Sequence, residues 1–403
     1  MERRVIILGS TGSIGTQALG VIAHLNALAD AGSSPLRFRV VGLAAGRNAD
    51  LLAAQARRFA VADLALASSG AAPPDARTFR GPNAAEELVR AVECDLVLAA
   101  IVGIAGLPAT LAAVELGRDV ALANKETLVA AGALVIPAAR RSGARLLPVD
   151  SEHSAIGQCL APCIQGTPDG KRSCSAAPPL ALDGSVHRLI LTASGGALRS
   201  LPTDRLRAAT PEQALKHPTW TMGPKVTIDS ASLMNKALEL IEAHWLFGAP
   251  ADRLAAVLHP ESVVHALVEL VDGSVLAHLA APDMKVPIQH ALTWPHRLPG
   301  GGRRLNPLGL GALRFEPVDP DRYPALALAH RAIESGGTAG AILNAANEAA
   351  VDAFLRQERP IPFGWIADVA ADAMRSIPVK PAASLGAIME ADALARRFVL
   401  ECP

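Results

Sequence analysis

The chain has 403 residues, and half of them are hydrophobic, which is enough for two or three domains with buried cores. It contains 38 Lys and Arg residues and 38 Asp and Glu residues, so its formal net charge is zero. A zero net charge argues against a nucleic-acid-binding protein, which usually carries a basic excess. The five cysteines are widely spread and lack the spacing of a zinc site, so we expect reduced thiols in a cytoplasmic protein.

The N-terminal segment has the pattern of a nucleotide-binding unit. An apolar run at residues 4–8 predicts a short buried strand, and residues 16–28 follow a helical pattern. The loop between them contains Gly9, Gly12 and Gly15. These glycines allow a tight turn and let a pyrophosphate approach the helix N-terminus, where unpaired N–H groups favour anions. A structural tight turn is the alternative, and the order of strand, loop and helix favours the nucleotide site.

The second predicted strand, residues 38–43, bears on the choice of cofactor. A fold specific for NAD usually has an acid at the end of this strand, which binds the ribose 2′-hydroxyl. No acid stands at this strand end, and Arg47 lies in that region instead. Because an arginine can pair with a 2′-phosphate, the sequence favours NADP. A surface arginine at the start of a helix is the alternative.

Three further strands are predicted at residues 95–101, 119–123 and 145–149, and the first two lead into helices. This alternation predicts an α/β fold with an N-terminal, Rossmann-like, doubly wound and mostly parallel sheet. Residues 96–114 carry no charge and are long enough to span a bilayer, but glycines and Pro108 interrupt them. A buried strand followed by a helix explains them better, so we expect neither a membrane segment nor a signal peptide.

Polar side chains follow the last two of these strands. Asn124, Lys125 and Glu126 come after one strand, and Asp150 and Glu152 come after the other. Open parallel sheets bind ligands at the carboxyl ends of their strands. Side chains in a strand alternate faces, so Asp150 and Glu152 are predicted to point the same way. Converging carboxylates suit Mg²⁺ or Mn²⁺ better than Zn²⁺, whereas two solvated acids in a turn are the alternative.

The middle of the chain opens with a predicted surface loop at residues 161–187, which are rich in Pro, Gly and Ser. A strand at residues 187–192 then runs into Ser194, Gly195 and Gly196. Small residues with a hydroxyl at a strand end can cradle an oxyanion, and a plain turn is an equally good explanation.

Residues 216–225 mix Pro and Gly with Trp220 and Met222 and show no clear periodicity. A large aromatic side chain on such a loop is typical of a lid that excludes water from an active site. A Trp and a Met buried in the core are the alternative.

The stretch 229–242 is predicted to be a turn or strand end that runs into a helix. Asn235, Glu239 and Glu242 are spaced by four and three residues, so they share one helical face. One interpretation is that this face is ordinary solvated surface. The alternative is a phosphate site near the helix start, with the hydroxyl of Ser230, the amide of Asn235 and the ammonium group of Lys236 as its ligands.

The remaining chain predicts a small sheet, a linker and a helical end. Residues 257–259, 262–269 and 275–279 are expected to form antiparallel strands. We interpret their histidines as structural: His259, His265 and His278. Residues 294–320 turn to Gly and Pro and predict a linker, and residues 321–403 are mostly helical by pattern, with two longer helices followed by two shorter ones.

Nine short motifs, taken together, resemble one enzyme family along essentially the whole chain. They are Gly-Ser-Thr-Gly-Ser-Ile-Gly (9–15), Ala-Gly-Arg-Asn (45–48), Leu-Ala-Asn-Lys-Glu (122–126), Leu-Leu-Pro-Val-Asp-Ser-Glu-His (146–153), Ser-Gly-Gly (194–196), His-Pro-Thr-Trp-Thr-Met-Gly (217–223), Asp-Ser-Ala (229–231), Met-Asn-Lys-Ala-Leu-Glu (234–239) and Asn-Ala-Ala-Asn-Glu (344–348). In this order they resemble the 1-deoxy-D-xylulose-5-phosphate reductoisomerase family. Each motif is weak alone, but the ordered set is highly specific.

The resemblance implies an NADP-dependent oxidoreductase of the non-mevalonate isoprenoid pathway, which is also an isomerase. Such an enzyme converts 1-deoxy-D-xylulose 5-phosphate to 2-C-methyl-D-erythritol 4-phosphate. The resemblance implies two cofactors, NADPH and one divalent cation. The cation is Mg²⁺ or Mn²⁺, with Co²⁺ as a further candidate. The resemblance also implies a cytoplasmic homodimer that acts on a small sugar phosphate and binds neither nucleic acid nor membrane.

The resemblance also implies roles for individual residues. NADPH contacts are expected from Thr11, Gly12, Ser13, Ile14, Gly46, Arg47, Asn48, Asn124, Glu126 and Gly223. The expected metal ligands, which are catalytic together with Lys125, are Asp150, Glu152 and Glu239. Substrate contacts are expected from Lys125, Ser151, Glu152, Ser194, His217, Trp220, Ser230, Asn235, Lys236 and Glu239. Of these, four surround the phosphate: Ser194, Ser230, Asn235 and Lys236.

The expected domains follow the same resemblance. Residues 1–150 form an NADPH-binding domain, and residues 151–293 form an α+β catalytic domain with a flap at 216–225. Residues 294–320 are a linker, and residues 321–403 form a C-terminal helical domain. The chain departs from the expected family pattern at three positions: Arg47 replaces Lys and keeps its charge, Pro224 replaces a frequent basic residue and loses any cofactor contact there, and Leu198 replaces an aromatic. The loop at 161–187 is also longer than expected. None of these departures removes a metal ligand or a phosphate contact.

Other protein classes fit these residues less well. A short-chain dehydrogenase uses a Tyr-x-x-x-Lys pair, but the single tyrosine, Tyr323, is followed four residues later by Ala327. A metal-free semialdehyde or homoserine-type dehydrogenase is the enzyme alternative, and it would not need three carboxylates to converge. A non-enzymatic NADP-binding sensor would bind the cofactor without turnover and would lack a second phosphate site.

Overall fold

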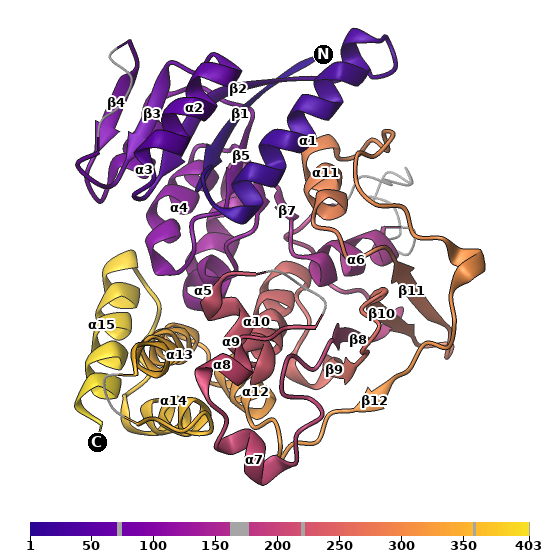
Figure 1. Cartoon of the computed structure of the whole chain (residues 1–403), viewed down its shortest axis with the longest axis vertical. Helices are drawn as coiled ribbons and strands as arrows, with labels where there is room; N and C mark the ends of the chain where they lie inside the picture. The colour runs from indigo at the N-terminus through magenta and orange to yellow at the C-terminus, as the bar shows by residue number, and fades with distance from the viewer. Residues whose placement is uncertain (71–74, 162–176, 219–221, 358–359, 403) are drawn as a thin grey trace.

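The structure is a computed structural model that describes residues 1–70, 75–161, 177–218, 222–357 and 360–402. Its N-terminal part forms one sheet with helices on both faces, a second sheet lies beside it, and the C-terminal helices lie below the first sheet (Figure 1). Within these ranges, no helix is long and apolar enough to cross a membrane.

The first sheet has seven parallel strands in the order β4-β3-β2-β1-β5-β6-β7. The predicted doubly wound parallel sheet is therefore confirmed. Two strands were not predicted, because each has only four residues and carries charged ends: β3 and β4. The strands are β1 (Glu2–Leu8), β2 (Arg37–Ala45), β3 (Asp63–Leu66), β4 (Arg77–Arg80), β5 (Leu96–Ala99), β6 (Asp119–Leu122) and β7 (Leu146–Pro148).

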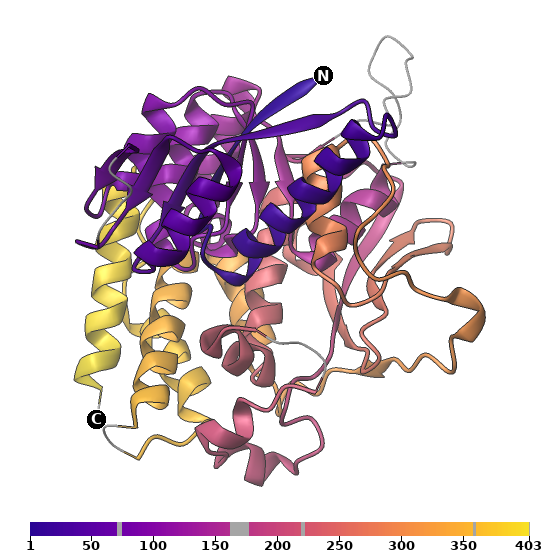
Figure 2. The ribbon, with the colours of Figure 1, turned by 45° about the horizontal axis from the view of Figure 1, so that its top comes forward.

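Helices cover both faces of this sheet, and that is why its strands are continuous apolar runs. Alternate residues of β1 enter different cores, because Val5 and Ile7 pack on one face and Ile6 and Leu8 on the other. The first face is covered by α1 (Ser13–Asp30), α2 (Ala49–Phe59) and α11 (Lys285–Thr293), and α1 runs across the sheet in Figure 2. The second face is covered by α3 (Ala84–Ala91), α4 (Leu107–Glu115) after the short turn η1 (Ile104–Gly106), and α5 (Lys125–Ser142).

The carboxyl ends of the strands meet at one edge of the sheet. β1 ends in a turn at Gly9, whose φ is +78°, and a Cβ at this position would clash with the Ala100 carbonyl oxygen beyond β5. Only glycine fits here, and the turn delivers the chain to the N-terminus of α1. Asn124 follows β6 and Asp150 follows β7, so both reach the same edge. This edge, between β1 and β5, is where doubly wound sheets bind their ligands.

The second sheet has five strands in the order β11-β10-β8-β9-β12. β10 and β11 pair antiparallel, as predicted, and β9 runs in the opposite direction to β10, also as predicted. β9 does not pair with β10, however, because β8 lies between them and pairs parallel with β9. The described chain between β8 and β9 contains several helices and brings β9 back to the end of the sheet at which β8 starts. The strands are β8 (Val186–Ala193), β9 (Leu254–Leu258), β10 (Val264–Leu270), β11 (Val275–Leu279) and β12 (Glu316–Pro317), the last from the segment expected to be a linker.

The remaining helices join the two sheets and form the C-terminal part. α6 (Ser151–Leu160) packs on β10 and β11, and α10 (Met234–Phe247) packs on α5. Between β8 and β9 the chain also forms α7 (Thr203–Arg207), α8 (Pro211–Ala214), α9 (Pro224–Ala231) and η2 (Ala251–Arg253), and η3 (Pro307–Gly309) lies before β12. The last helices are α12 (Ala325–Ser335), α13 (Ala339–Arg356), α14 (Trp365–Ser376) and α15 (Leu385–Glu401). The expectation that the last two helices are shorter than the two before them was wrong for α15, which has 17 residues against 11 in α12.

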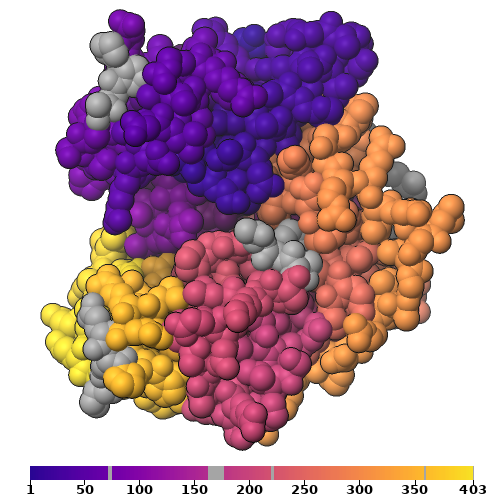
Figure 3. Space-filling view, viewed as in Figure 1, coloured from indigo at the N-terminus to yellow at the C-terminus, as the bar shows by residue number. Residues whose placement is uncertain are grey.

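Two contacts fix the C-terminal helices against the rest of the chain. α13 packs against α5 of the N-terminal part, and α12 packs against α10 of the middle part. In the space-filling view the surface is indented where the indigo N-terminal part meets the rose and orange segments (Figure 3). The carboxyl edge of the first sheet and α10 therefore approach each other from different parts of the chain.

Candidate active site

Three carboxylates meet where α6 begins and α10 passes. Asp150 is the N-cap residue of α6, Glu152 lies in its first turn, and Glu239 lies in the second turn of α10. One oxygen from each lies within 4.8 Å of the others. The structure thus brings together the three residues that the resemblance implied as metal ligands. Three oxygen donors of this type fit Mg²⁺ or Mn²⁺.

The local geometry that brings Asp150 and Glu152 together differs from the prediction. We expected both side chains on one face of an extended strand, but β7 ends at Pro148 and a helix starts at Ser151. Asp150 has φ −59° and ψ 133° and makes the turn from strand to helix. The carboxylates therefore converge because a helix begins there, and strand alternation was the wrong reason.

Two lysines are interleaved with the three carboxylates. Lys125 Nζ lies 2.7 Å from Asp150 Oδ2 and 2.9 Å from Glu239 Oε1. Lys236 Nζ lies 2.6 Å from Glu152 Oε1 and also pairs with Glu239 Oε2. Each ammonium thus bridges two acids, and the alternation of charge lets five ionisable groups share a buried site.

The pKa values of these groups follow from burial and from their neighbours. Burial alone would lower the pKa of Lys125, but Asp150 and Glu239 outweigh it and hold that pKa well above its usual value. Burial would raise the pKa of Asp150, but Lys125 outweighs it and holds that pKa below its usual value. Burial, followed by repulsion from Glu152, raises the pKa of Glu239. A cation beside Glu239 would offset this repulsion.

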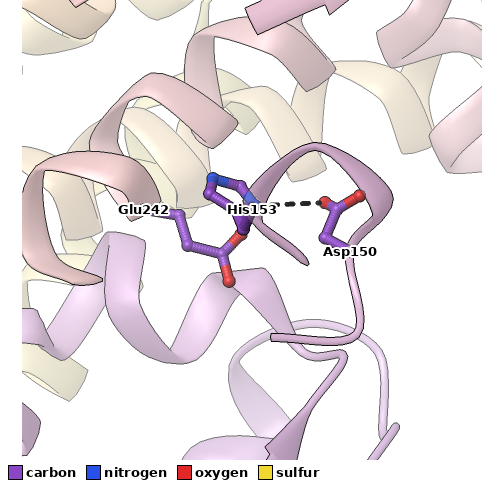
Figure 4. A group of neighbouring side chains, drawn as sticks. All are labelled: Asp150, His153 and Glu242. Carbon is purple, nitrogen blue, oxygen red and sulfur yellow. Dashed lines mark ion pairs between the residues drawn. The ribbon is translucent and has the colours of Figure 1, made fainter. Parts of the chain in front are cut away.

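A second layer of ionisable groups lies behind Asp150 (Figure 4). His153 Nδ1 lies 3.4 Å from Glu242 Oε2 and 3.9 Å from Asp150 Oδ2. His153 Nε2 donates to the Glu239 main-chain oxygen at 2.8 Å, which fixes the ring between α6 and α10. The side chains of His153 and Glu242 are fully buried. These two residues were not predicted as part of the site.

Ser151, an expected substrate contact, is held by hydrogen bonds on two sides. Its hydroxyl donates to Glu152 Oε2 at 2.5 Å and lies 3.1 Å from His265 Nδ1. Burial lowers the pKa of His265 to about 4, so its imidazole is neutral at neutral pH. We interpreted His265 as structural from the sequence, and no spacing in the chain indicated that β10 would bring it to Ser151.

The residues expected to surround the phosphate fall into two groups. Ser194 Oγ lies 3.1 Å from His217 Nε2 and accepts from Gly196 N at 3.2 Å. A Cβ on Gly196 would meet the main chain of Ser230, so this turn abuts the end of α9. The side chains of Asn235 and Lys236 face the carboxylates instead. Asn235 donates a hydrogen bond to Glu239, and Lys236 forms an ion pair with it.

Ser230 occupies a different local structure from the one predicted. Asp229 and Ser230 lie inside α9, where we expected a turn or strand end. The break falls at Leu233, whose φ is +58°, and α10 begins at the next residue. α9 also starts earlier than expected, at Pro224, within the stretch predicted to be a flap. Trp220 lies outside the described residues, so its predicted place in the flap is not described.

The expected NADPH contacts lie at three strand ends and one helix start. One group lies around the start of α1: Thr11, Gly12, Ser13 and Ile14. A second group follows β2 and is exposed: Gly46, Arg47 and Asn48. Asn48 accepts from Leu51 N at 3.1 Å and caps α2. Gly223 is the N-cap residue of α9. The first two groups therefore follow the carboxyl ends of β1 and β2.

Asn124 and Glu126 are buried and joined to other groups of the site. Asn124 Nδ2 donates to Glu126 Oε2 at 2.8 Å and to Gly103 O at 3.1 Å. Lys225 Nζ lies 3.1 Å from both Glu126 Oε1 and Asp229 Oδ2, so it ties α5 to α9. Lys225 was not predicted as a site residue. Its separation from Glu126 in the chain left no signal in the sequence.

The fold and the site together define a class of protein. A doubly wound parallel sheet with a glycine turn before α1, and a cluster of carboxylates at its carboxyl edge, is typical of a nucleotide-dependent oxidoreductase with a divalent-cation site. Family models match most of the chain: 1-deoxy-D-xylulose 5-phosphate reductoisomerase over residues 5–132, its C-terminal domain over 146–247, and the DXP reductoisomerase C-terminal domain over 279–398. The chain belongs to the 1-deoxy-D-xylulose 5-phosphate reductoisomerase family.

Individual relatives agree with the family models. The chain is 49% identical to the 1-deoxy-D-xylulose 5-phosphate reductoisomerase of Symbiobacterium thermophilum over 100% of its own length and 99% of that protein. It is 48% identical to the Anaeromyxobacter sp. strain K enzyme, over 98% of this chain and 96% of that one.

Solved structures of the family also match. A DOX-P reductoisomerase in complex with NADPH, fosmidomycin and magnesium has a TM-score of 0.86 and 37% identity, with 99% of this chain and 97% of that chain covered. The Zymomonas mobilis enzyme in complex with NADPH has a TM-score of 0.83 and 39% identity, with 99% and 98% covered. The metal-free dehydrogenase and the non-enzymatic sensor are therefore no longer needed as explanations.

Proposed function

We propose that this chain converts 1-deoxy-D-xylulose 5-phosphate to 2-C-methyl-D-erythritol 4-phosphate with NADPH and one divalent cation, Mg²⁺ or Mn²⁺. The observation that carries the proposal is the meeting of Asp150, Glu152 and Glu239 at the carboxyl edge of a dinucleotide-type sheet. The related structure with NADPH, fosmidomycin and magnesium supports the choice of ligands. When bound, the cation polarises the substrate carbonyl and stabilises negative charge on its oxygens.

The residues around the carboxylates hold and orient the substrate in this proposal. Lys125 keeps its proton and offers a fixed ammonium beside Asp150, where it balances charge and can bind a substrate hydroxyl. Ser151 presents a hydroxyl whose direction His265 and Glu152 set. Ser194, with His217 and Ser230, forms the near wall of the phosphate site. Asn235 and Lys236 complete that site by turning from Glu239 when the substrate and cation bind.

The cofactor lies along the carboxyl edge of the first sheet in this proposal. The start of α1 at Thr11, Gly12, Ser13 and Ile14 binds the pyrophosphate, because its free N–H groups point there. Arg47 and Asn48, with Gly46, bind the adenosine end, and Arg47 reads the 2′-phosphate. Asn124, Glu126 and Gly223 lie toward the nicotinamide. This arrangement supports residues 1–150 as the NADPH-binding domain, 151–293 as the catalytic domain with a flap at 216–225, 294–320 as a linker and 321–403 as the helical domain.

We also propose that the protein is a cytoplasmic homodimer. β11 is an edge strand of the second sheet, and Val275 and Leu279 on it are 53% and 39% exposed. An edge strand with exposed apolar side chains is a ready surface for pairing with a second copy. Cys94 is a buried free thiol, which suits a reducing compartment.

One assay tests the proposed reaction directly. NADPH oxidation should require both 1-deoxy-D-xylulose 5-phosphate and Mg²⁺ or Mn²⁺, and fosmidomycin should inhibit it. Glu239→Gln should lower turnover by at least about a hundredfold, because it removes one charge of the cation site. Glu87→Gln, an exposed acid on α3, is the matched control and should not change it. Full turnover after removal of all divalent metal would contradict the proposal.

A further inference from the structure

A basic cavity lies away from the three-carboxylate cluster, between α11 and the segment that follows it. Its volume is about 200 Å³. In Figure 1 this segment loops from α11 past α1 before it turns toward β12. No acidic residue lines the cavity among the residues that the structure describes. Six basic side chains do: Lys285, His290, His296, Arg297, Arg303 and Arg304.

Within the described ranges, the permanent cations of this cavity have no acidic partner. None of its three arginines, nor Lys285, forms an ion pair with a described residue. The adjacent acid, Asp283, is already engaged, because its two oxygens accept from the main-chain nitrogens of Lys285 and Arg303 at 3.0 and 2.8 Å. Like charges gathered around one cavity repel each other, so this arrangement favours an anion between them.

Main-chain anchors hold the wall of the cavity in place. Gln289 Nε2 donates to Leu298 O at 3.0 Å, and Thr293 Oγ1 donates to His296 O at 3.0 Å. On the outer side, His24 Nε2 of α1 contacts Pro299 O at 3.0 Å. Together with Asp283, these bonds fix the segment at both sides of the arginines. The cations are therefore presented by an anchored wall and not by a free linker.

A buried atom of the wall lacks, among the described residues, the hydrogen-bond partner that burial normally requires. His290 Nδ1 is buried and has no hydrogen-bond partner among the described residues. Burial, and then the charge of Arg297, lowers the pKa of His290 to about 4, so the ring is neutral at neutral pH. Burial also lowers the pKa of Arg297. A neutral imidazole with a free ring nitrogen can donate a hydrogen bond to an anion that the arginines attract.

The position of the cavity separates it from the expected NADPH site. The pyrophosphate of a dinucleotide lies at the start of α1, near Ser13. His24, which touches the cavity wall, lies about 16 Å further along the same helix. The cavity also shares none of its lining residues with the three-carboxylate cluster.

We propose that this cavity is a second anion site that binds a diphosphate group, either as the free ion or as part of a small organic diphosphate. One lysine and three arginines supply four positive charges, and the adjacent Asp283 supplies one negative charge. A diphosphate balances the remaining positive charge better than a single phosphate does. The cavity has room for a group of this size and not for a polymer. The inference stands apart from the proposed reaction, because none of its residues belongs to that site.

Calorimetric titration of the NADPH-loaded full chain with sodium pyrophosphate, in metal-free buffer, tests the proposal. NADPH occupies the dinucleotide site, so the titration reports on other sites. We expect one pyrophosphate per chain, bound at least about tenfold more tightly than orthophosphate. ADP in a parallel titration distinguishes the two sources: binding of both ligands assigns the diphosphate group, and binding of pyrophosphate alone assigns the free ion.

A matched pair of double variants locates the site. Arg303→Ala with Arg304→Ala should weaken pyrophosphate binding at least about tenfold and leave NADPH oxidation unchanged. Arg140→Ala with Arg141→Ala removes an adjacent, exposed arginine pair from the end of α5 and should leave binding within about twofold. Equal weakening by both double variants would overturn the proposal, and so would the absence of binding. A changed sedimentation coefficient for the Arg303/Arg304 variant with unchanged pyrophosphate binding would instead assign this surface to contact between copies of the chain.

Discussion

His153 Nδ1 lies 3.4 Å from Glu242 Oε2, and neither side chain is exposed to solvent. Because His153 Nε2 must donate to the Glu239 carbonyl, a neutral ring has only a lone pair at Nδ1. A lone pair facing a carboxylate would be repulsive. A proton on the Glu242 carboxyl replaces this repulsion with a hydrogen bond to Nδ1.

The first prediction is a pH dependence that this proton causes. Burial raises the pKa of Glu242 to about 7, even though His153 opposes the shift. Since the folded pKa is raised, the stabilisation is complete below the unfolded pKa of about 4.3 and is lost as the pH rises through about 7. The glutamine of Glu242→Gln stays neutral at every pH. Between pH 5 and 8 the free energy of unfolding should therefore fall less in this variant than in the wild type, by a difference on the order of 3 kcal/mol.

Urea unfolding of metal-free protein at both pH values measures this difference. Glu87→Gln, an exposed acid on α3, serves as the control and should follow the wild type. Parallel curves for the wild type and Glu242→Gln would show that Glu242 does not hold the proton.

The contrast between Glu239 and Glu242 shows what the sequence can and cannot reveal about the site. Their spacing places both on one face of a helix, but the same spacing describes solvated acids, and only the packing of α10 against α5 and α6 buries them. The convergence of Asp150 and Glu152 was predicted correctly but for the wrong local reason. The prediction assumed an extended strand, whereas here the start of a helix brings the two residues together. Contacts between distant segments, such as Lys225 with Glu126, have no local pattern at all.

The fold was more accessible because burial leaves a local signature. β1, β5 and β6 are apolar on both faces, so they read as strands in the sequence, and the glycine turn after β1 places the first helix. β3 and β4 are four-residue strands near the sheet edge with charged ends, and their pairing is decided by β2. The place of β9 beside β8 was not predicted, because the order of strands in a sheet depends on the crossover between them and not on the strand itself.

The second prediction concerns the cofactor and rests on the exposed Arg47 after β2, where no acid stands at the strand end. Arg47→Ala should weaken NADPH binding by about 1.5–3 kcal/mol and leave NADH binding nearly unchanged, because only NADPH carries the 2′-phosphate. Fluorescence titrations with both cofactors measure the two affinities. An equal loss for NADPH and NADH would mean that Arg47 does not bind the 2′-phosphate.

The third prediction uses two helical glycines with opposite surroundings. A Cβ on Gly340 of α13 would clash with the Val129 carbonyl oxygen of α5, whereas a Cβ on Gly20 of α1 would meet nothing within 4 Å. Gly340→Ala should therefore destabilise the protein by about 1–3 kcal/mol. Gly20→Ala should stabilise it by about 0.5–1 kcal/mol, because alanine loses less backbone freedom in a helix. Thermal unfolding of both variants gives the signs, and a stable Gly340→Ala protein would mean that α13 can move away from α5.

The last prediction concerns Lys125, whose ammonium lies 2.7 Å from Asp150 Oδ2 and 2.9 Å from Glu239 Oε1. Those oxygens are also the expected ligands of the cation, so Lys125 and the metal compete for the same negative charge. Lys125→Met removes the competitor and leaves the acids less compensated. It should therefore tighten Mn²⁺ binding in the absence of substrate by about tenfold, while turnover falls because a substrate contact is lost.

Titration with Mn²⁺ followed by electron paramagnetic resonance measures this affinity in the wild type and the variant. Lys225→Met is the matched control, because Lys225 is buried to a similar degree but pairs with Glu126 and Asp229, outside the three carboxylates. Its Mn²⁺ affinity should stay within about twofold of the wild type, since its charge lies further from the cluster. Weaker Mn²⁺ binding by Lys125→Met would reverse the interpretation: Lys125 would then serve to hold Asp150 and Glu239 in position for the cation, and its bond to Asn235 Oδ1 at 2.8 Å would be part of that support.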